Sequence, residues 1–544
     1  MRTLTACIAL AAWSAVSTAS VAHAQKACAD ATLTVNDALQ VGAFGVRMAH
    51  DGDILVALDG TTGTSINGGG TLHVFERSAS GAWEWTNTIA PPPDIVTADG
   101  FGVAFDVWDG WLAISAPADD PLGTNSGSVF VYERVGRGQW NLVSTLVNPP
   151  EGSSPTNSAF YGWRIAGEGD VFAVALPFSS VPVFNGQGVQ TGQVTSGAVL
   201  VYRRTLLGTW EVETKLRSLP LLEDTVFGLS LALDEGRLYV GTSGEKVGAI
   251  TTSSVTVHEH VNGAWTPTAK FLEPSLAAST DFGEAIAVDG DVLAIGSPNV
   301  ERCHTYVRQT DGTWSEPELV PAPFPFVSND WGSSLAVRGD TLVVGTTNQG
   351  TTCQLYERAA SGAWYRSLDL SWCGPESAPQ FGVSVIATDD EFLIGAWGTT
   401  FGQPDLGSIA VFRRGSLYHS VLEDSTVLPI GQKLFLRAGP RWAGAPYVVL
   451  GSLSGTAPGL ELGPGLVLPL NFDAYTSMTL ALSAPIDDAF DVLKLNGERT
   501  AAFETPTGLP PSMSGLVLHH AFVAIDPLTF ELHVSNSVPL RLVP

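Results

Sequence analysis

The stretch FGEAIAVDGDVLAIGSPN, residues 282–299, decides the fold. It holds two short apolar runs on either side of Asp289-Gly290-Asp291. Variants of it recur along the chain, and each starts with an aromatic residue followed by Gly. The seven aromatic residues are Phe44, Phe101, Tyr161, Phe227, Phe282, Trp331 and Phe381. Their spacing of 49 to 66 residues is typical of a repeat architecture.

Each repeat predicts four strands. A second apolar run follows the aromatic-Gly strand. The residue thirteen positions after the Gly, at the end of this run, is mostly small, and a small side chain there lets neighbouring backbones approach closely. An alternating strand ending as in Tyr356-Glu357-Arg358 comes next, and Gly-Ala before Trp364 predicts a hairpin into a fourth strand. Six fourth strands are marked by Trp83, Trp140, Trp210, Trp265, Trp314 and Trp364. Four strands per repeat favour propeller blades.

The seventh repeat lacks a fourth strand of its own. After Phe412-Arg413-Arg414 no Trp follows and the pattern changes. The segment 31–36 precedes the first aromatic-Gly pair as each Trp strand precedes the next one. We therefore expect this segment to complete the seventh blade and close the ring, because closure removes exposed strand edges.

These residues resemble the FG-GAP repeat, which occurs in the seven-bladed propeller of integrin alpha subunits and in many secreted bacterial proteins. The order of Phe-Gly, Gly-Ala-Pro and an aromatic strand carries the resemblance over residues 31–414. Single repeats are degenerate, since the closing Pro remains only at Pro117, Pro177 and Pro298, and Leu58 takes the small position of the first repeat. The resemblance implies an all-β, integrin-alpha-like, seven-bladed propeller.

Composition agrees with a turn-rich, all-β, multidomain protein. The chain has 544 residues, of which 44% are hydrophobic and 15% charged, with 58 Gly and 34 Pro. Asp and Glu total 54 against 27 Lys and Arg, so the net charge is -27. Such a charge repels nucleic acid and anionic membranes and leaves cationic or neutral ligands.

The N-terminus carries an export signal. Arg2 precedes an apolar stretch that ends in Ala22-His23-Ala24, the small-x-small pattern of a signal-peptidase site. We expect a signal peptide at 1–24, the propeller at 25–414 and a secreted or cell-surface location after cleavage near Ala24. Neither a lipid-attachment Cys before this site nor a later run of 18 apolar residues occurs in the sequence, so no membrane anchor is expected.

The last residues differ from the repeats. After a linker at 415–420, short apolar strands broken by Gly and Pro predict a separate small β-sandwich at 421–544. The stretches 438–459 and HHAFVAIDP from His519 resemble a C-terminal segment of exported bacterial proteins, for example from planctomycetes. The resemblance implies a sorting, attachment or purely structural module.

One loop is a candidate calcium site. Integrin-like propellers bind calcium between the second and third blade strands through an Asp-x-Asp-x-Asp-Gly-x-x-Asp loop. The nearest match here offers oxygen atoms from Asp119, Asp120 and Asn125, but it departs from that motif in spacing and charge. The alternative is a turn shaped by solvated carboxylates, Gly and Asn. We expect no other cofactor.

The four cysteines outside the signal peptide allow three pairings, of which geometry favours one. Cys28, Cys303, Cys353 and Cys373 remain after export, and Cys353 and Cys373 lie on opposite arms of one predicted hairpin. We therefore predict that these two pair.

Two histidine motifs have structural alternatives. His258-Glu259-His260 places two imidazoles on one face of a strand, as zinc ligands can lie, but it occupies the aromatic-charged-charged position of the blade. His519-His520 has no nucleophile or carboxylate nearby in sequence. Phosphate-loop, Rossmann, zinc-protease and nucleophile-elbow motifs do not occur.

We therefore expect an exported, non-enzymatic binding or cell-surface protein that presents propeller loops to a protein or glycan. The long loop at 178–196 is either such a binding loop or a tolerated insertion without function. One alternative is an extracellular hydrolase or lyase with acidic or His side chains of perturbed pKa at the axial mouth. The other is a purely structural surface component.

Overall fold

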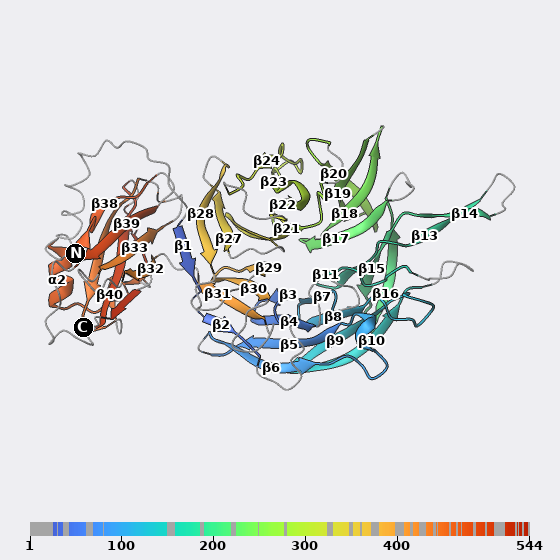
Figure 1. Ribbon diagram of the computed structural model, residues 1–544, viewed down its shortest axis with the longest axis horizontal. Helices are drawn as coiled ribbons and strands as arrows, with labels where there is room; N and C mark the ends of the chain where they lie inside the picture. The colour runs from blue at the N-terminus through green and yellow to red at the C-terminus, as the bar shows by residue number, and fades with distance from the viewer. Residues whose placement is uncertain are drawn as a thin grey trace. The chain divides into compact units, whose positions relative to one another are not determined.

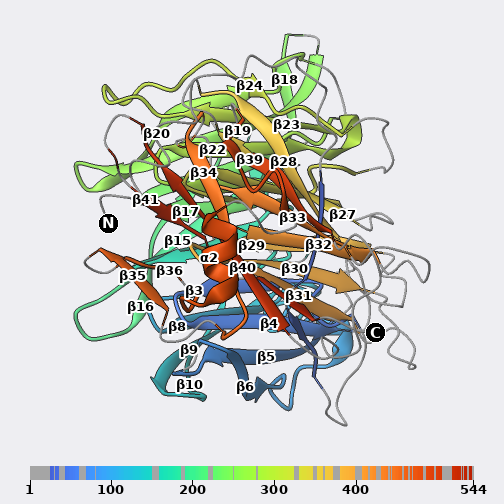
Figure 2. The same ribbon diagram turned by 90° about the vertical axis from the view of Figure 1, so that its left-hand side faces the viewer.

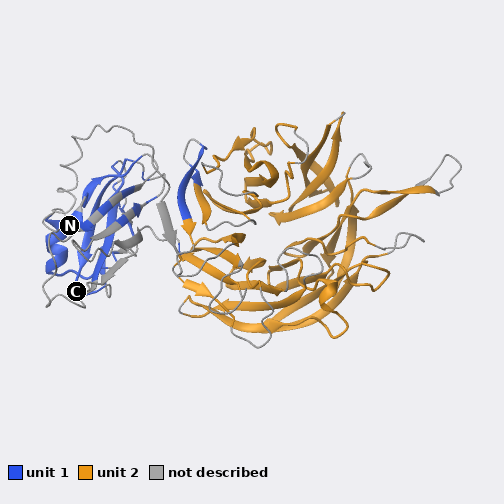
Figure 3. Cartoon of the chain, in the orientation of Figure 1, with its two compact units in different colours: residues 1–28, 357–369, 413–544 blue, residues 29–356, 370–412 orange. Residues whose placement is uncertain are grey.

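The computed structural model describes residues 25–541 except for gaps at 30, 36–42, 61–68, 80, 150–157, 185–189, 219–224, 249, 277–279, 324–329, 347–351, 359–361, 372–379, 398–406, 414–416, 424–430, 439–441, 443, 456–458, 464–465, 469, 482–485, 495–497, 505–516, 528–529, 531 and 536–537. The chain divides into two compact units (Figure 3). Unit 1 comprises residues 1–28, 357–369 and 413–544, and unit 2 comprises residues 29–356 and 370–412.

Unit 2 has a β-propeller-like, all-β fold built from antiparallel sheets, most of them with four strands (Figure 1). The first three sheets follow the chain. The first sheet consists of β3 (Met48–Asp51), β4 (Ile54–Gly60), β5 (Gly70–Arg77) and β6 (Trp83–Ile89). The second consists of β7 (Phe105–Trp108), β8 (Trp111–Ala116), β9 (Ser128–Gly136) and β10 (Gln139–Val147). The third consists of β11 (Ile165–Glu168), β12 (Val171–Leu176), β15 (Ala198–Arg204) and β16 (Trp210–Leu216).

The next sheets repeat the same strand order. The fourth sheet consists of β17 (Val226–Asp234), β18 (Arg237–Val247), β19 (Ile250–Val261) and β20 (Ala264–Leu272), and the fifth of β21 (Ile286–Asp289), β22 (Val292–Ser297), β23 (Arg302–Val307) and β24 (Glu318–Leu319). The sixth consists of β25 (Ser334–Arg338), β26 (Thr341–Gly345), β27 (Thr352–Arg358), β28 (Trp364–Ser371) and β1 (Gln25–Cys28), of which β1 and residues 357–369 are counted with unit 1. The last sheet has the order β2 (Ala31–Leu33), β31 (Ser408–Arg413), β30 (Glu391–Trp397) and β29 (Gln380–Ala387).

The N-terminal segment thus joins a sheet formed by residues 380 and beyond. Ala31, Thr32 and Leu33 of β2 pair antiparallel with Val411, Ala410 and Ile409 of β31. Val35, which follows β2, is 1% exposed and packs in a cluster with Phe44 and Leu55. β2 covers the first three residues of the segment 31–36, and its role in completing a seventh blade stays a prediction.

The stretch 282–299 forms β21, a two-residue turn at Gly290-Asp291, and β22. Phe282 is fully buried. Gly283 has φ of 85°, and a Cβ on Gly296 would overlap the backbone oxygen of Gly332, which belongs to the next aromatic-Gly pair. In the same way, an added Cβ would overlap a backbone oxygen of the following aromatic-Gly pair at three other glycines. These are Gly241 with Gly283 O, Gly345 with Gly382 O and Gly395 with Gly45 O. The small residue therefore lets each sheet meet the following one.

One predicted strand is much shorter than the others. Trp314 was expected to open a fourth strand, but it forms only an isolated bridge with Arg308, and β24 has two residues. Pro317 and Pro321 flank β24 and lack the N–H groups that a longer ladder requires.

A hairpin departs from the regular pattern between β12 and β15. β13 (Ser180–Phe184) and β14 (Gln190–Thr195) pair with each other and project from the rest of unit 2 (Figure 1). The hairpin accounts for most of the long loop at 178–196.

Unit 1 contains a β-rich C-terminal part. Its strands are β32 (Leu417–Glu423), β33 (Gly431–Arg437), β39 (Glu498–Glu504) and β37 (Ile486–Asp487) in one sheet, β38 (Phe490–Val492), β34 (Pro446–Ser452), β40 (Val517–Ile525), β41 (Leu532–Val534) and β42 (Val538–Arg541) in another, and the pair β35 (Leu460–Gly463) and β36 (Leu466–Leu468). A short helix, α2 (Ala474–Leu480), lies against β34, where Tyr475 contacts Gly451 (Figure 2). No helix among the described residues is long and apolar enough to cross a membrane.

Candidate binding sites in unit 2

A pocket of about 910 Å³ lies where the first strands of the sheets converge. It is lined by the ends of β3, β7, β11, β17, β21, β25 and β29 and by the turns that follow them. We call it the acidic pocket. Its acidic lining residues are Asp51, Asp53, Asp106, Asp109, Glu168, Asp234, Asp289, Asp389 and Asp390, against the two basic residues Arg77 and Arg338.

Most of these carboxylates connect one sheet to the next. Each accepts a hydrogen bond from a backbone N–H in or near the first turn of the following sheet. The pairs are Asp51 with Asp109 N (2.7 Å), Asp109 with Gly169 N (2.8 Å), Glu168 with Glu235 N and Gly236 N (both 2.7 Å), Asp234 with Gly290 N (3.0 Å) and Asp289 with Gly339 N (2.6 Å). Arg338 continues the series by donating to Asp289 at 3.0 Å and to Asp389 at 2.8 Å. The acids therefore hold the rim of the pocket in a defined geometry.

Two of the carboxyl groups titrate near neutral pH. Burial raises the pKa of the half-buried Asp106 to about 7, although the N–H groups of Gly167 and Val107 donate to its oxygen atoms at 2.8 and 3.0 Å. Burial likewise raises the pKa of Asp234 to about 6, against the hydrogen bond from Gly290. The pKa of Asp51 is raised for the same reason. Perturbed acids thus converge at one end of the first strands, which is the feature expected of an axial enzyme site.

A second cavity of about 270 Å³ lies at the opposite ends of the same strands. We call it the arginine cavity, because Arg47 and Arg164 line it together with Glu284 and several serines. Burial, followed by the charge of Arg164, lowers the pKa of Arg47 to about 9. Burial also lowers the pKa of Arg164, and the negative charge of Glu284, which raises this pKa, offsets the shift only in part. Two positive charges therefore lie here with one negative charge, that of Glu284.

Five apolar side chains separate the two cavities and line both. They are Ile165, Leu231, Ile286, Leu335 and Val385, each three positions after its aromatic-Gly glycine. The residue just before each of these apolar residues in the sequence lines the arginine cavity, and the residue just after it lines the acidic pocket. One strand per sheet thus supplies both surfaces.

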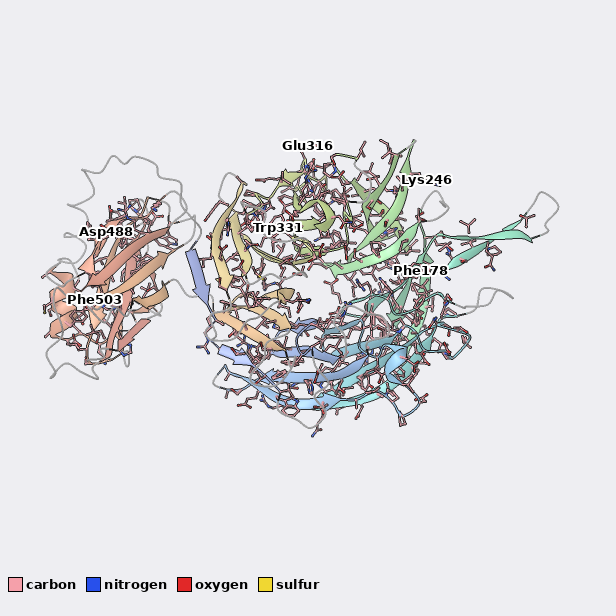
Figure 4. The ribbon with its side chains drawn as sticks, in the orientation of Figure 1. Phe178, Lys246, Glu316, Trp331, Asp488 and Phe503 are labelled. Atoms are coloured by element: carbon pink, nitrogen blue, oxygen red, sulfur yellow. The ribbon has the colours of Figure 1, made fainter. Side chains whose placement is uncertain are left out.

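Aromatic side chains surround the base of the hairpin. The rings of Phe160, Trp163 and Phe178 lie edge to face, with centroids 5.7 to 6.4 Å apart. Phe178 is 38% exposed and lies where the chain leaves β12 toward β13 (Figure 4). The guanidinium of Arg164 lies 5.5 Å from the centre of the Trp163 ring and donates to Trp163 O at 2.9 Å. The aromatic cluster therefore connects the hairpin to the arginine cavity.

The predicted calcium loop is organised by its own hydrogen bonds. Asp119 accepts from Asp120 N at 2.8 Å and from Ser128 Oγ at 2.5 Å. Asp120 accepts from Asn125 N at 2.6 Å, and Asn125 has φ of 51°. These contacts match the alternative of a carboxylate-shaped turn. In the portion of the chain that is described, no group of three or more His, Cys, Asp or Glu side chains could hold a metal ion. The calcium site stays a prediction.

The histidine motifs lie in packed strands. His258 is 4% exposed in β19, and burial lowers its pKa to about 4. Glu259 pairs with Arg308 at 3.3 Å, and His260 lies 3.1 Å from Glu213. Each side chain of the motif therefore has a structural environment of its own.

In unit 1, His520 is buried in the middle of β40, where its Nε2 lies 2.8 Å from Tyr475 Oη. Burial lowers the pKa of His520 to about 3, so this imidazole is a neutral core group. His519 lies beside it on the same strand.

Two predictions fall on residues that the structure does not describe. Cys353 is buried in β27, but Cys373 lies outside the described residues, so their disulfide stays a prediction. The signal peptide at 1–24 also lies outside them.

Sequence reasoning missed the arginine cavity. Two positions after the aromatic-Gly glycine the other five repeats have only Ala or Ser, namely Ala104, Ser230, Ala285, Ser334 and Ser384. Ser334 and Ser384 donate to Gly382 O and Gly45 O of the next repeat at 2.6 and 2.7 Å. Arg47 and Arg164 break this pattern, and an alignment of the repeats could have identified them.

Comparisons with known proteins do not establish a family. Neither a family model nor a curated relative matches the chain. A crystal structure of a protein from Lactobacillus plantarum is 12% identical, with a TM-score of 0.40, and the match covers 66% of this chain and 99% of that one. Sqt1 from Chaetomium thermophilum is 11% identical, with a TM-score of 0.40, over 75% of this chain and 96% of its own. The description of the fold therefore rests on the strands themselves.

Proposed function

We propose that the protein is an exported, non-enzymatic binding protein whose unit 2 is a seven-bladed propeller of the FG-GAP type. The ring is closed by β2 and by contacts between the last and first repeats. Ser384 Oγ donates to Gly45 O, and Phe44 forms a bridge with Gly407. Closure supports binding, because it holds all the lining strands of a central pocket in fixed positions.

The single observation that carries the proposal is the acidic pocket. Its volume falls in the range of about 300 to 1,000 Å³ that ligand pockets have, and its charge favours a cationic group. We propose that it receives a basic segment of a partner protein. Asp53, whose side chain is 82% exposed, and the exposed Asp390 are the carboxylates most open to such a segment.

Peptide binding to the full-length exported protein tests this proposal. A Lys-rich decapeptide should bind at physiological salt, and a Glu-rich peptide of equal length should not. Replacing Asp53 and Asp390 by Asn should weaken binding about tenfold, if each lost charge pair contributes about 0.7 kcal/mol. The matched control replaces the exposed Asp94 by Asn and the exposed Glu316 by Gln, both outside the pocket. Figure 4 labels Glu316. If both double variants weakened peptide binding equally, the effect would come from the net charge of the protein and not from the acidic pocket.

The raised pKa values of Asp106 and Asp234 favour a second candidate, an extracellular hydrolase with general acid chemistry at this mouth. A screen of glycoside and ester substrates tests it. Turnover that disappears in Asp106→Asn or Asp234→Asn, while the melting temperature is retained, would establish the enzyme and replace the first proposal.

A further inference from the structure

The arginine cavity contains two cations against one carboxylate, Glu284, among its described lining residues. Among the described residues, no salt bridge or hydrogen bond involves the Arg47 side chain, and the Arg164 guanidinium donates only to Trp163 O. Three other arginines of unit 2 do have carboxylate partners. Arg77, Arg134 and Arg338 each meet a carboxylate oxygen at 2.8 to 3.0 Å. A buried or half-buried guanidinium without a partner is costly, so the pair calls for an explanation.

The sequence register argues against a purely structural role for the pair. A small side chain suffices at this position in the other five repeats, where Ser or Ala occurs. An Arg at the same position must instead extend its guanidinium into the cavity that it lines. A residue that departs from the pattern of its repeat and makes no stabilising contact in return is a candidate for a functional residue.

The cavity also offers neutral donors and a fixed orientation for one arginine. Ser333 Oγ is buried, lines the cavity and has no hydrogen-bond partner among the described residues. The Trp163 ring and carbonyl hold Arg164 from one side. Glu284 is the one carboxylate among the described lining residues. Two guanidinium groups therefore face a single acid.

We infer that the arginine cavity binds an oxyanion, either a carboxylate or a tetrahedral phosphate or sulfate, between Arg47 and Arg164 with Ser333 as a further donor. Guanidinium groups present paired N–H donors that match the oxygen atoms of such anions. A bound anion satisfies both arginines and separates their like charges. This site is distinct from the acidic pocket and does not require that pocket to bind anything.

Calorimetric titration of the full-length exported protein with acetate, phosphate and sulfate, each at constant ionic strength, tests the inference. At least one anion should bind saturably, and the preferred one identifies the ligand group. Arg47→Gln with Arg164→Gln should weaken that binding at least tenfold. Arg137→Gln with Arg203→Gln, two exposed arginines of unit 2 that pair with Glu84 and Glu213, is the matched control and should leave it unchanged.

A second variant keeps the test decisive if the double Gln variant does not fold. Glu284→Gln removes the carboxylate that competes for the arginines and should tighten binding of the same anion about threefold or more. A structural role alone would not produce tighter binding. Absence of saturable binding of all three anions, or equal affinity in wild type and the Arg variants, would overturn the inference.

Discussion

Glycine occurs at two positions of the repeat around Phe282, for two different reasons. Gly283 adopts φ of 85°, which side chains with a Cβ rarely allow, while Gly296 leaves room for the carbonyl oxygen of Gly332. The two positions sit at the start and end of the inner pair of strands. The repetition in the sequence therefore reflects packing between successive sheets.

Gly296→Ala should destabilise unit 2. The added methyl group would overlap a backbone oxygen that cannot rotate away, and overpacking of this kind costs about 1 to 3 kcal/mol. Denaturant unfolding followed by circular dichroism measures the loss. Gly192→Ala is a control for the backbone, because Gly192 is also a strand residue without a positive φ and its Cβ would meet nothing within 4 Å. An equal loss in both variants would show that backbone conformation, not the close approach, determines the effect.

Asp106 should make the stability of unit 2 depend on pH in an unusual direction. Its folded pKa of about 7 lies above the ordinary value of 3.8, so the folded state holds this proton more tightly than the unfolded state does. Its contribution is fully present below pH 3.8, declines as the pH rises to about 7, and stays constant above that. Asp106→Asn cannot ionise, so its stability relative to wild type should rise from pH 4 to pH 7.

Thermal unfolding of wild type and Asp106→Asn at several pH values gives this difference directly. The comparison removes all other titrating groups, since both proteins share them. A difference that does not change between pH 4 and pH 7 would mean that Asp106 titrates with an ordinary pKa.

At the scale of elements, periodicity predicts strands well where side chains alternate and fails where proline or an insertion intervenes. The patterns around Trp83 and Trp364 predict fourth strands that the structure contains. Trp314 carries the same signal, yet Pro317 and Pro321 leave only the two-residue β24. The hairpin of β13 and β14 was expected only as a long loop, because a stretch rich in Gly and Gln has no alternating pattern.

The candidate sites were harder to predict than the strands. Asp289 is visible in the sequence as a turn residue, but its bond to Gly339 N connects repeats fifty residues apart. Likewise, Arg47 and Arg164 line one cavity although they come from the first and third repeats, 117 positions apart in the sequence. Such sites follow from how the repeats assemble, which a single repeat does not reveal.

Deleting residues 31–35 should destabilise unit 2 strongly. The deletion removes β2 from its ladder with β31 and exposes Phe44 and Leu55, which pack in the same cluster as Val35. Loss of the Val35 side chain alone costs on the order of 1 to 3 kcal/mol, and the lost ladder adds to it. The melting temperature of unit 2 measures the effect. An unchanged value would show that β2 does not contribute to closure.

At the scale of the whole molecule, the two compact units should unfold as separate transitions. Each has its own hydrophobic clusters, around Phe44 and Leu55 in unit 2 and around Tyr447 and Phe522 in unit 1. Asp473 offers a way to shift unit 1 alone. Burial raises the pKa of this N-cap carboxylate, but hydrogen bonds from Thr476, Ser454 and Leu453 outweigh it and lower the pKa overall.

Asp473→Ala should therefore lower the unit 1 transition in scanning calorimetry, with a cap loss of about 1 to 2 kcal/mol, and leave the unit 2 transition in place. Because the folded pKa lies below 3.8, this contribution is present at neutral pH and disappears only as the pH falls through the folded pKa. Ser477→Ala, in the same helix, loses only an exposed hydroxyl bond and serves as control. The residue 31–35 deletion should move the other transition. A single transition that shifts as a whole in both variants would mean that the two units unfold cooperatively.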